Sequence, residues 1–113
     1  MNLGIIGCGA IGTDVAKAAD AMKEIEHIYL YDSKVTASST LMNSLKKAEV
    51  KTVQDFLPDV DVVVESASQQ AVEEYGIQVL QAGKHLIIMS IGSLFNDTLK
   101  KELSCSKEMP GKR

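Results

Sequence analysis

Three glycines near the amino terminus have the spacing of a phosphate-binding turn. Gly7, Gly9 and Gly12 form a G-x-G-x-x-G pattern within GCGAIG, directly after a short apolar run. Between a strand and a helix, the first glycine permits a tight turn, the second lets a ligand approach the backbone, and the third lets helix and strand pack closely. The amides of Ala10 and Ile11 would then point at a phosphate from the positive end of a helix. The pattern therefore predicts an elbow that binds a diphosphate.

Asp32 supplies a second feature of the same chemistry. It lies about 20 residues beyond Gly12, at the end of the next apolar run. A carboxylate there accepts hydrogen bonds from adenosine ribose hydroxyls and repels the 2′-phosphate of NADP. We therefore expect NAD as cofactor, with NADP possible because Lys34 could pair with that phosphate. The alternative, a glycine turn beside an ordinary surface aspartate, is weaker because three features agree at the required spacing.

Hydrophobic periodicity predicts the elements that would position these residues. Strands are expected at residues 3–6, 28–31, 50–53, 60–65 and 86–89, and helices at 11–22, 35–47, 69–81 and 96–103, with a turn or short helical piece over 54–59 ended by Pro58. Alternating strands and helices require a parallel sheet joined by right-handed crossovers. The expected fold class is α/β, a three-layer Rossmann fold with strand order 3-2-1-4-5 and helices on both faces.

Small and polar residues follow the fourth and fifth predicted strands, as ESASQ at 65–69 and SIGS at 90–93. Ligands of parallel sheets bind beyond the carboxyl ends of strands, so these segments would let a ribose and a nicotinamide lie against backbone. Ser68 also suits the cap of the following helix. Glu65 could be a functional carboxylate, but a lone acid at a strand end is more often solvated.

Composition limits the other functions. The 113 residues fit one domain, expected at 1–103, and the polar tail at 104–113 is expected to be disordered. A net charge of −3 argues against nucleic acid as a partner. Neither a membrane span nor a signal peptide is visible, so we expect a cytoplasmic protein. Cys8 and Cys105 have no metal-ligand pattern and are expected to be free thiols, and His27 and His85 to be strand-entry residues.

Two longer stretches carry a resemblance. DVVVESASQQAV at 61–72 and AGKHLIIMSIGSL at 82–94, together with GCGAIG, resemble the cofactor domain of L-aspartate dehydrogenases and, less closely, that of homoserine dehydrogenases. The resemblance implies NAD(P)-dependent interconversion of aspartate with iminoaspartate, or with oxaloacetate and ammonia. It also implies that the adenosine and pyrophosphate are held by Gly7, Gly9, Ala10, Ile11, Gly12 and Asp32, and that the nicotinamide side is lined by Ala67, Ser68, Ser90 and Gly92.

The chain also departs from that family. Its members are longer, and their second domain supplies the catalytic histidine, which neither His27 nor His85 matches. We therefore expect no catalytic residue here, and a truncated or frameshifted gene or an isolated domain that is inactive alone. Apolar surface near Leu94, Phe95 and Leu99 would favour a homo-oligomer unless a substrate domain covers it. Two alternatives to a dehydrogenase cofactor domain are a non-catalytic NAD-binding module and an FAD or S-adenosylmethionine site on the same fold.

Overall fold

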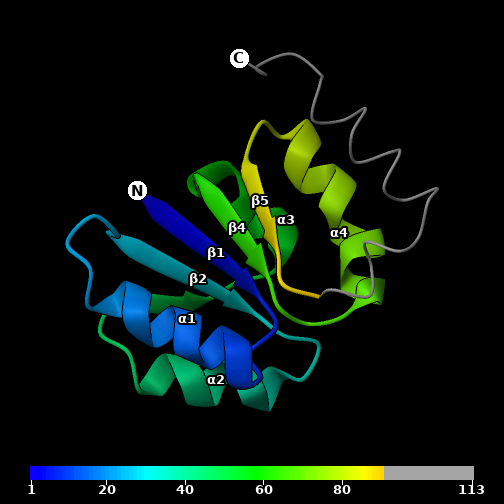
Figure 1. Cartoon of the computed structure of the whole chain (residues 1–113). Coiled ribbons are helices and arrows are strands. Elements are labelled where there is room, and N and C mark those ends of the chain that lie inside the picture. Colours follow the sequence, from blue (N-terminus) through cyan, green and yellow to red (C-terminus); the bar gives the residue numbers. More distant parts are fainter. Residues whose placement is uncertain (91–113) are drawn as a thin grey trace.

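A five-stranded parallel sheet forms the centre of the molecule (Figure 1). The computed structural model describes residues 1–90. The strand order is β3-β2-β1-β4-β5, which confirms the predicted fold class and topology. In chain order the elements are β1 (Asn2–Ile6), α1 (Ala10–Asp20), β2 (His27–Tyr31), α2 (Val35–Asn43), β3 (Ala48–Val50), α3 (Val53–Phe56), a 3₁₀ turn (Leu57–Asp59), β4 (Val62–Glu65), α4 (Gln69–Gln81) and β5 (His85–Ile88).

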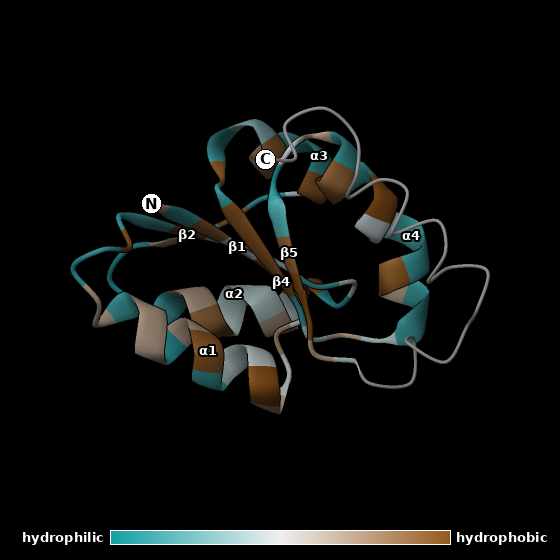
Figure 2. Cartoon of the chain, turned by 45° about the horizontal axis from the view of Figure 1, so that its top comes forward, coloured by the Kyte–Doolittle hydropathy of each residue, from teal (hydrophilic) through white to brown (hydrophobic). Residues whose placement is uncertain are grey.

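Helices cover both faces of the sheet, with α1 and α2 on one side and α3 and α4 on the other (Figure 1). Because successive strand side chains point to opposite faces, β1 contributes to two separate cores. Leu3 and Ile5 pack with residues of α1 and α2, whereas Ile6 packs with residues of α3 and α4. Figure 2 shows the apolar residues gathered along the strands, as expected for a sheet that is covered on both faces.

Two predicted elements, the second helix and the third strand, differ from the structure for local reasons. The helix predicted over 35–47 ends at Asn43, where the Ser44 hydroxyl donates to the carbonyl of Leu41 at 2.8 Å. The strand predicted over 50–53 lies at Ala48–Val50. Thr52 cannot continue that strand because its side chain accepts from the amide of Asp55 and caps α3.

Other boundaries match more closely. Helix α4 occupies the predicted residues, His27 and His85 begin strands as expected, and α1 ends two residues before the predicted position. The piece predicted over 54–59 is α3 followed by the 3₁₀ turn, and Pro58 lies inside that turn rather than ending it. None of the helices within residues 1–90 has the length and apolar character needed to cross a membrane.

Several predictions concern residues outside the described range of 1–90. They are the helix at 96–103, the domain limit at 103, the disordered tail at 104–113, the free thiol of Cys105, the nicotinamide contact of Gly92, and the apolar surface near Leu94, Phe95 and Leu99.

Candidate functional site

The glycine elbow lies at the junction of β1 and α1, where the sequence placed it. Gly7 has a φ of +101°, a backbone conformation that disfavours any side chain, and a Cβ there would lie 2.7 Å from the amide nitrogen of Ala67. A Cβ on Gly12 would lie 1.9 Å from the carbonyl oxygen of Gly7 and 2.8 Å from the hydroxyl of Ser66. Both positions are therefore glycine because the neighbouring backbone occupies the space.

Gly9 differs from the other two glycines. It is the N-cap residue of α1, with an extended backbone at φ −80° and ψ −154°, and a Cβ there would meet nothing within 4 Å. No side chain caps α1, and its first turn holds no acidic residue. The first amides of a helix need acceptors that the helix itself does not supply. The packing leaves open space for such an acceptor beside Gly9, which suits an anion from outside the chain.

Asp32 lies within reach of the elbow and joins it to the loop after β2. Its Oδ2 accepts from the amide of Cys8 at 2.7 Å, and its Oδ1 accepts from the amide of Lys34 at 2.8 Å. An ionised carboxylate offers about four lone-pair positions. Two backbone amides therefore fix the orientation of Asp32 and leave acceptor capacity for sugar hydroxyls.

A cavity of about 160 Å³ lies beside this carboxylate, between the ends of β1, β2 and β4 and the start of α4. The Tyr75 hydroxyl donates to the Tyr31 hydroxyl at 3.4 Å, and the two rings meet edge to face with centroids 5.8 Å apart. That hydrogen bond, together with burial, raises the pKa of Tyr75, so the phenol stays neutral. The lining residues include Gly7, Tyr31, Asp32, Ala67, Ser68 and Tyr75, so the fold brings four predicted site residues around one space.

Glu65 contradicts the sequence-based expectation of a solvated acid, because it is only 1% exposed. Its Oε2 accepts from the amides of Ala67 at 2.9 Å and Ser68 at 2.8 Å, and from the hydroxyl of Ser90 at 2.6 Å. Its neighbour Ser66 donates to the carbonyl of Gly7 at 2.9 Å. The sequence carried one signal for this arrangement, an acid directly followed by small residues whose amides can bend back to it.

Ser68 fulfils the capping role considered from the sequence, because its hydroxyl accepts from the amide of Ala71 at 3.1 Å. The amide of Ser68 binds Glu65 at the same time. Both the cap and the Glu65 contact fix the turn between β4 and α4, which forms one wall of the cavity.

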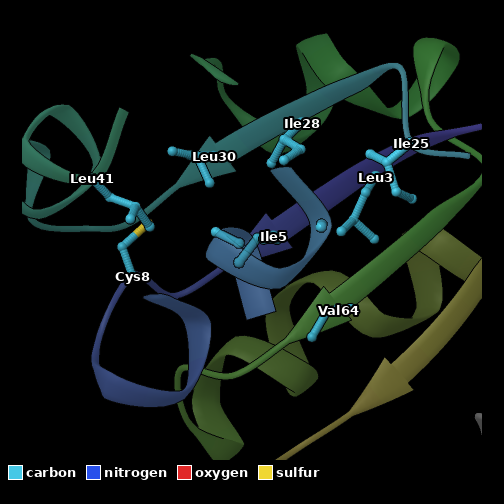
Figure 3. Packing of buried hydrophobic residues seen from close by; sticks show 10 residues of the cluster. Leu3, Ile5, Cys8, Ile25, Ile28, Leu30, Leu41 and Val64 are labelled. Carbon is cyan, nitrogen blue, oxygen red and sulfur yellow. The ribbon is translucent and has the colours of Figure 1, made fainter. Parts of the chain in front are cut away.

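The Cys8 side chain belongs to the hydrophobic core, whereas its backbone amide binds Asp32. Its side chain is buried in the α1 and α2 core beside Leu41 (Figure 3). Burial, and to a lesser degree the nearby Asp32 charge, raise the pKa of the Cys8 thiol to about 11. Within residues 1–90, no group of three or more His, Cys, Asp or Glu side chains could hold a metal ion.

We expect Cys8 to resist alkylation. In a Cys105→Ser variant, its reaction with iodoacetamide at pH 8 should be about 100-fold slower than that of free cysteine, because the thiolate is the nucleophile. Mass spectrometry should show the rate rising with pH toward 11. Since folding raises this pKa from 9.0, the protein should also lose stability as the pH rises from 9 to 11. A rate equal to that of free cysteine would contradict the buried position.

A strand, a glycine elbow, a helix and a carboxylate on the neighbouring strand together define a Rossmann dinucleotide-binding domain. Open space at an uncapped helix start and a carboxylate oriented by two backbone amides are features that such domains use to bind dinucleotides. Residues 7–113 match the family described as homoserine dehydrogenase, NAD binding domain. The chain belongs to that family of NAD-binding domains of dehydrogenases, and NAD is its cofactor.

Relatives of known activity are similar over nearly the whole chain. The L-aspartate dehydrogenase of Methanosarcina barkeri is 37% identical over 109 residues, a match that covers 91% of this chain and 39% of that protein. The same enzyme of Methanothermobacter thermautotrophicus is 35% identical over 104 residues, covering 91% and 40%. The crystal structure of aspartate dehydrogenase from Thermotoga maritima has a TM-score of 0.69 and 27% identity, covering 94% of this chain and 40% of that one. The chain thus spans about 40% of the length of the curated relatives it matches.

Proposed function

We propose that this chain is the cofactor domain of an L-aspartate dehydrogenase. The observation that carries the proposal is the junction of β1 and α1, where Gly9 leaves open space at uncapped helix amides within reach of Asp32. The choice of aspartate is supported by relatives at 35–37% identity that are L-aspartate dehydrogenases. When bound, NAD supplies the nicotinamide ring that accepts or donates the hydride.

The residues of this chain would bind and orient the cofactor. Gly7 and Gly12 shape the elbow, the amides at Gly9, Ala10 and Ile11 face the pyrophosphate, and Asp32 accepts from the adenosine ribose. The proposed role of these strand ends on the nicotinamide side is supported by the sheet order, in which β4 neighbours β1 and β5 follows β4. The residues proposed for that side are Ala67, Ser68, Ser90 and Gly92.

NAD should bind more tightly than NADP. The Asp32 carboxylate lies where the ribose hydroxyls of NAD are expected, and it would repel a 2′-phosphate. Lys34 follows Asp32 by two residues and, with Lys17, lines a wider depression between α1 and α2. Lys34 offers positive charge near the same ribose, so NADP should still bind, with lower affinity.

The substrate could alternatively be homoserine, because the matching family takes its description from homoserine dehydrogenase. The relatives named L-aspartate dehydrogenase favour aspartate. Cytoplasmic location is part of the proposal, supported by the free thiol of Cys8, which is typical of reducing compartments. The proposed partner is a substrate-binding domain, or a second copy of this chain.

The isolated 113-residue chain should show no turnover. Hydride transfer requires a substrate held against one face of the nicotinamide with water excluded, and we place no substrate-binding residue in this chain. Purified chain with NAD and aspartate, followed by absorbance of NADH, should give no signal above the buffer control. Detectable aspartate oxidation would contradict this expectation.

Calorimetric titration tests the proposed binding directly. NAD should bind saturably to one site per chain, NADP should bind more weakly, and FAD and S-adenosylmethionine should give no comparable signal. Absence of saturable NAD binding would overturn the proposal.

A further inference from the structure

We propose that Glu65 is a positioning residue that holds the ends of β4 and β5 in the arrangement that receives the nicotinamide half of NAD. This inference rests on the proposed function, since it assigns these two strand ends to the nicotinamide side. The role is distinct from that proposed for Asp32, which directly follows β2 and would accept from the ribose of the adenosine half.

The Glu65 side chain contacts the segment that follows β4 and the residue Ser90 after β5, so it links two separate parts of the chain. The carboxylate accepts from the amides of Ala67 and Ser68 after β4, and from the hydroxyl of Ser90 after β5 at 2.6 Å. Its other oxygen lies 3.4 Å from the amide of Ser90. Hydrogen bonds to an ionised acceptor are shorter and stronger than neutral ones. One buried side chain therefore connects both segments.

These contacts continue the connection beyond the end of the sheet. The β4–β5 pairing ends at Glu65 and Ile88, and the last backbone bond runs from the amide of Met89 to the carbonyl of Glu65 at 2.8 Å. Ser90 is the next residue, and it is held by the Glu65 side chain. Ala67, held by the same side chain, packs directly against Gly7. Glu65 thus sets the distance between the β4–α4 turn and the end of β5.

The nature of the partners indicates a role in positioning. Burial of a carboxylate is unfavourable unless hydrogen bonds satisfy it, and an apolar residue often stabilises a core at least as well. Within residues 1–90, no lysine, arginine or histidine pairs with Glu65. An acceptor-only group surrounded by donors fits this position because it orders three residues, Ala67, Ser68 and Ser90, that we place beside the nicotinamide.

The test compares two ligands that differ only in the nicotinamide. NAD and ADP-ribose are titrated into the ¹⁵N-labelled chain, and amide shifts are recorded together with dissociation constants. In the unaltered chain, shifts specific to NAD should appear at residues 67, 68 and 90. A Glu65→Gln variant should lose those shifts and bind NAD about tenfold more weakly, because the amide group places a donor against existing donors. Its dissociation constant for ADP-ribose should change by less than about twofold.

Two further variants control the experiment. Glu73→Gln removes an exposed carboxylate on α4 and should leave both ligands unaffected. If Glu65→Gln does not fold, Glu65→Asp replaces it, because that change keeps the carboxylate but shortens its reach toward Ser90, and it should lower NAD affinity in the same selective way. Circular dichroism and melting temperature establish whether each variant is folded.

The outcomes separate the two proposals. Failure of the unaltered chain to bind either ligand overturns the proposed function, and this inference with it. Binding of both ligands with no NAD-specific shifts at residues 67, 68 and 90 overturns only the inference. Equal losses of NAD and ADP-ribose affinity in folded Glu65→Gln also overturn it, because a merely structural role would affect both ligands alike.

Discussion

Replacing Gly9 with alanine should abolish most NAD binding and leave the protein folded, whereas the same change at Gly12 should destabilise the fold. A Cβ on Gly9 meets no protein atom within 4 Å but enters the space assigned to the pyrophosphate. Its backbone is already compatible with alanine. Alanine caps a helix less well than glycine but restricts the unfolded chain, so the free energy of unfolding should change by less than about 1 kcal/mol. NAD affinity should fall at least about tenfold.

Gly12→Ala is the matched comparison. Its Cβ would lie 1.9 Å from the carbonyl oxygen of Gly7, and backbone cannot move aside as a flexible side chain can. Overpacking of this kind destabilises by about 1–3 kcal/mol or more. The melting temperature should fall by about 10 °C or more. Thermal unfolding and calorimetric titration with NAD on both variants test this pair of predictions. Normal NAD binding by Gly9→Ala would contradict the assignment of the space beside Gly9 to the pyrophosphate.

Replacing Asp32 with alanine should weaken NAD by about 10- to 100-fold and weaken NADP less. The physical reason is the loss of the charged hydrogen-bond acceptor for the ribose hydroxyls, which contributes about 1.5–3 kcal/mol in all, while the repulsion of a 2′-phosphate also disappears. Calorimetric titration of both cofactors measures the two changes separately. The selectivity for NAD over NADP should therefore shrink.

Two control variants separate ribose binding from local structure, because Asp32 also holds the amides of Cys8 and Lys34. Asp32→Asn offers one acceptor oxygen where the carboxylate offers two, so it keeps only one of these contacts, and it should still reduce the preference for NAD because the negative charge is lost. Its melting temperature, compared with that of Asp32→Ala, shows how much of the affinity loss comes from the elbow. Asp14→Ala removes an exposed carboxylate from α1 and should change NAD affinity by less than about twofold. Equal losses for NAD and NADP in folded Asp32→Ala would argue that the residue acts only through the elbow.

The sequence was sufficient for the elements that combine strong periodicity with a specific motif. GCGAIG predicted the junction of β1 and α1, and the topology followed because alternating strands and helices leave few arrangements of a parallel sheet. Helix α4 was predicted to the residue, since Ser68 caps its start and Gly83, with φ of +78°, follows its end.

Features that depend on distant partners were not predictable in this way. Asp20 accepts from the amides of Lys46 and Lys47, so the chain leaves the helical conformation well before its apolar pattern ends. Gly4 leaves room for the ring of Phe56, a residue far along the chain. A Cβ on Gly4 would lie 2.7 Å from that ring. Sequence periodicity registers neither contact, because both depend on the folded arrangement.

The burial of Glu65 shows the same limitation within the site. Carboxylates are almost never fully buried unless they are paired, so exposure was the reasonable expectation. The pairing comes from two backbone amides nearby and from Ser90, 25 residues away. Only the β4–β5 pairing brings that hydroxyl into reach.

A crystal structure of this chain with bound NAD would test the location of the cofactor without any substitution. The pyrophosphate should lie against the amides of residues 9–12, and the adenosine ribose hydroxyls should lie within hydrogen-bonding distance of the Asp32 carboxylate. NAD bound elsewhere on the sheet, or bound with its ribose beyond the reach of Asp32, would contradict the assignment of this junction as the dinucleotide site.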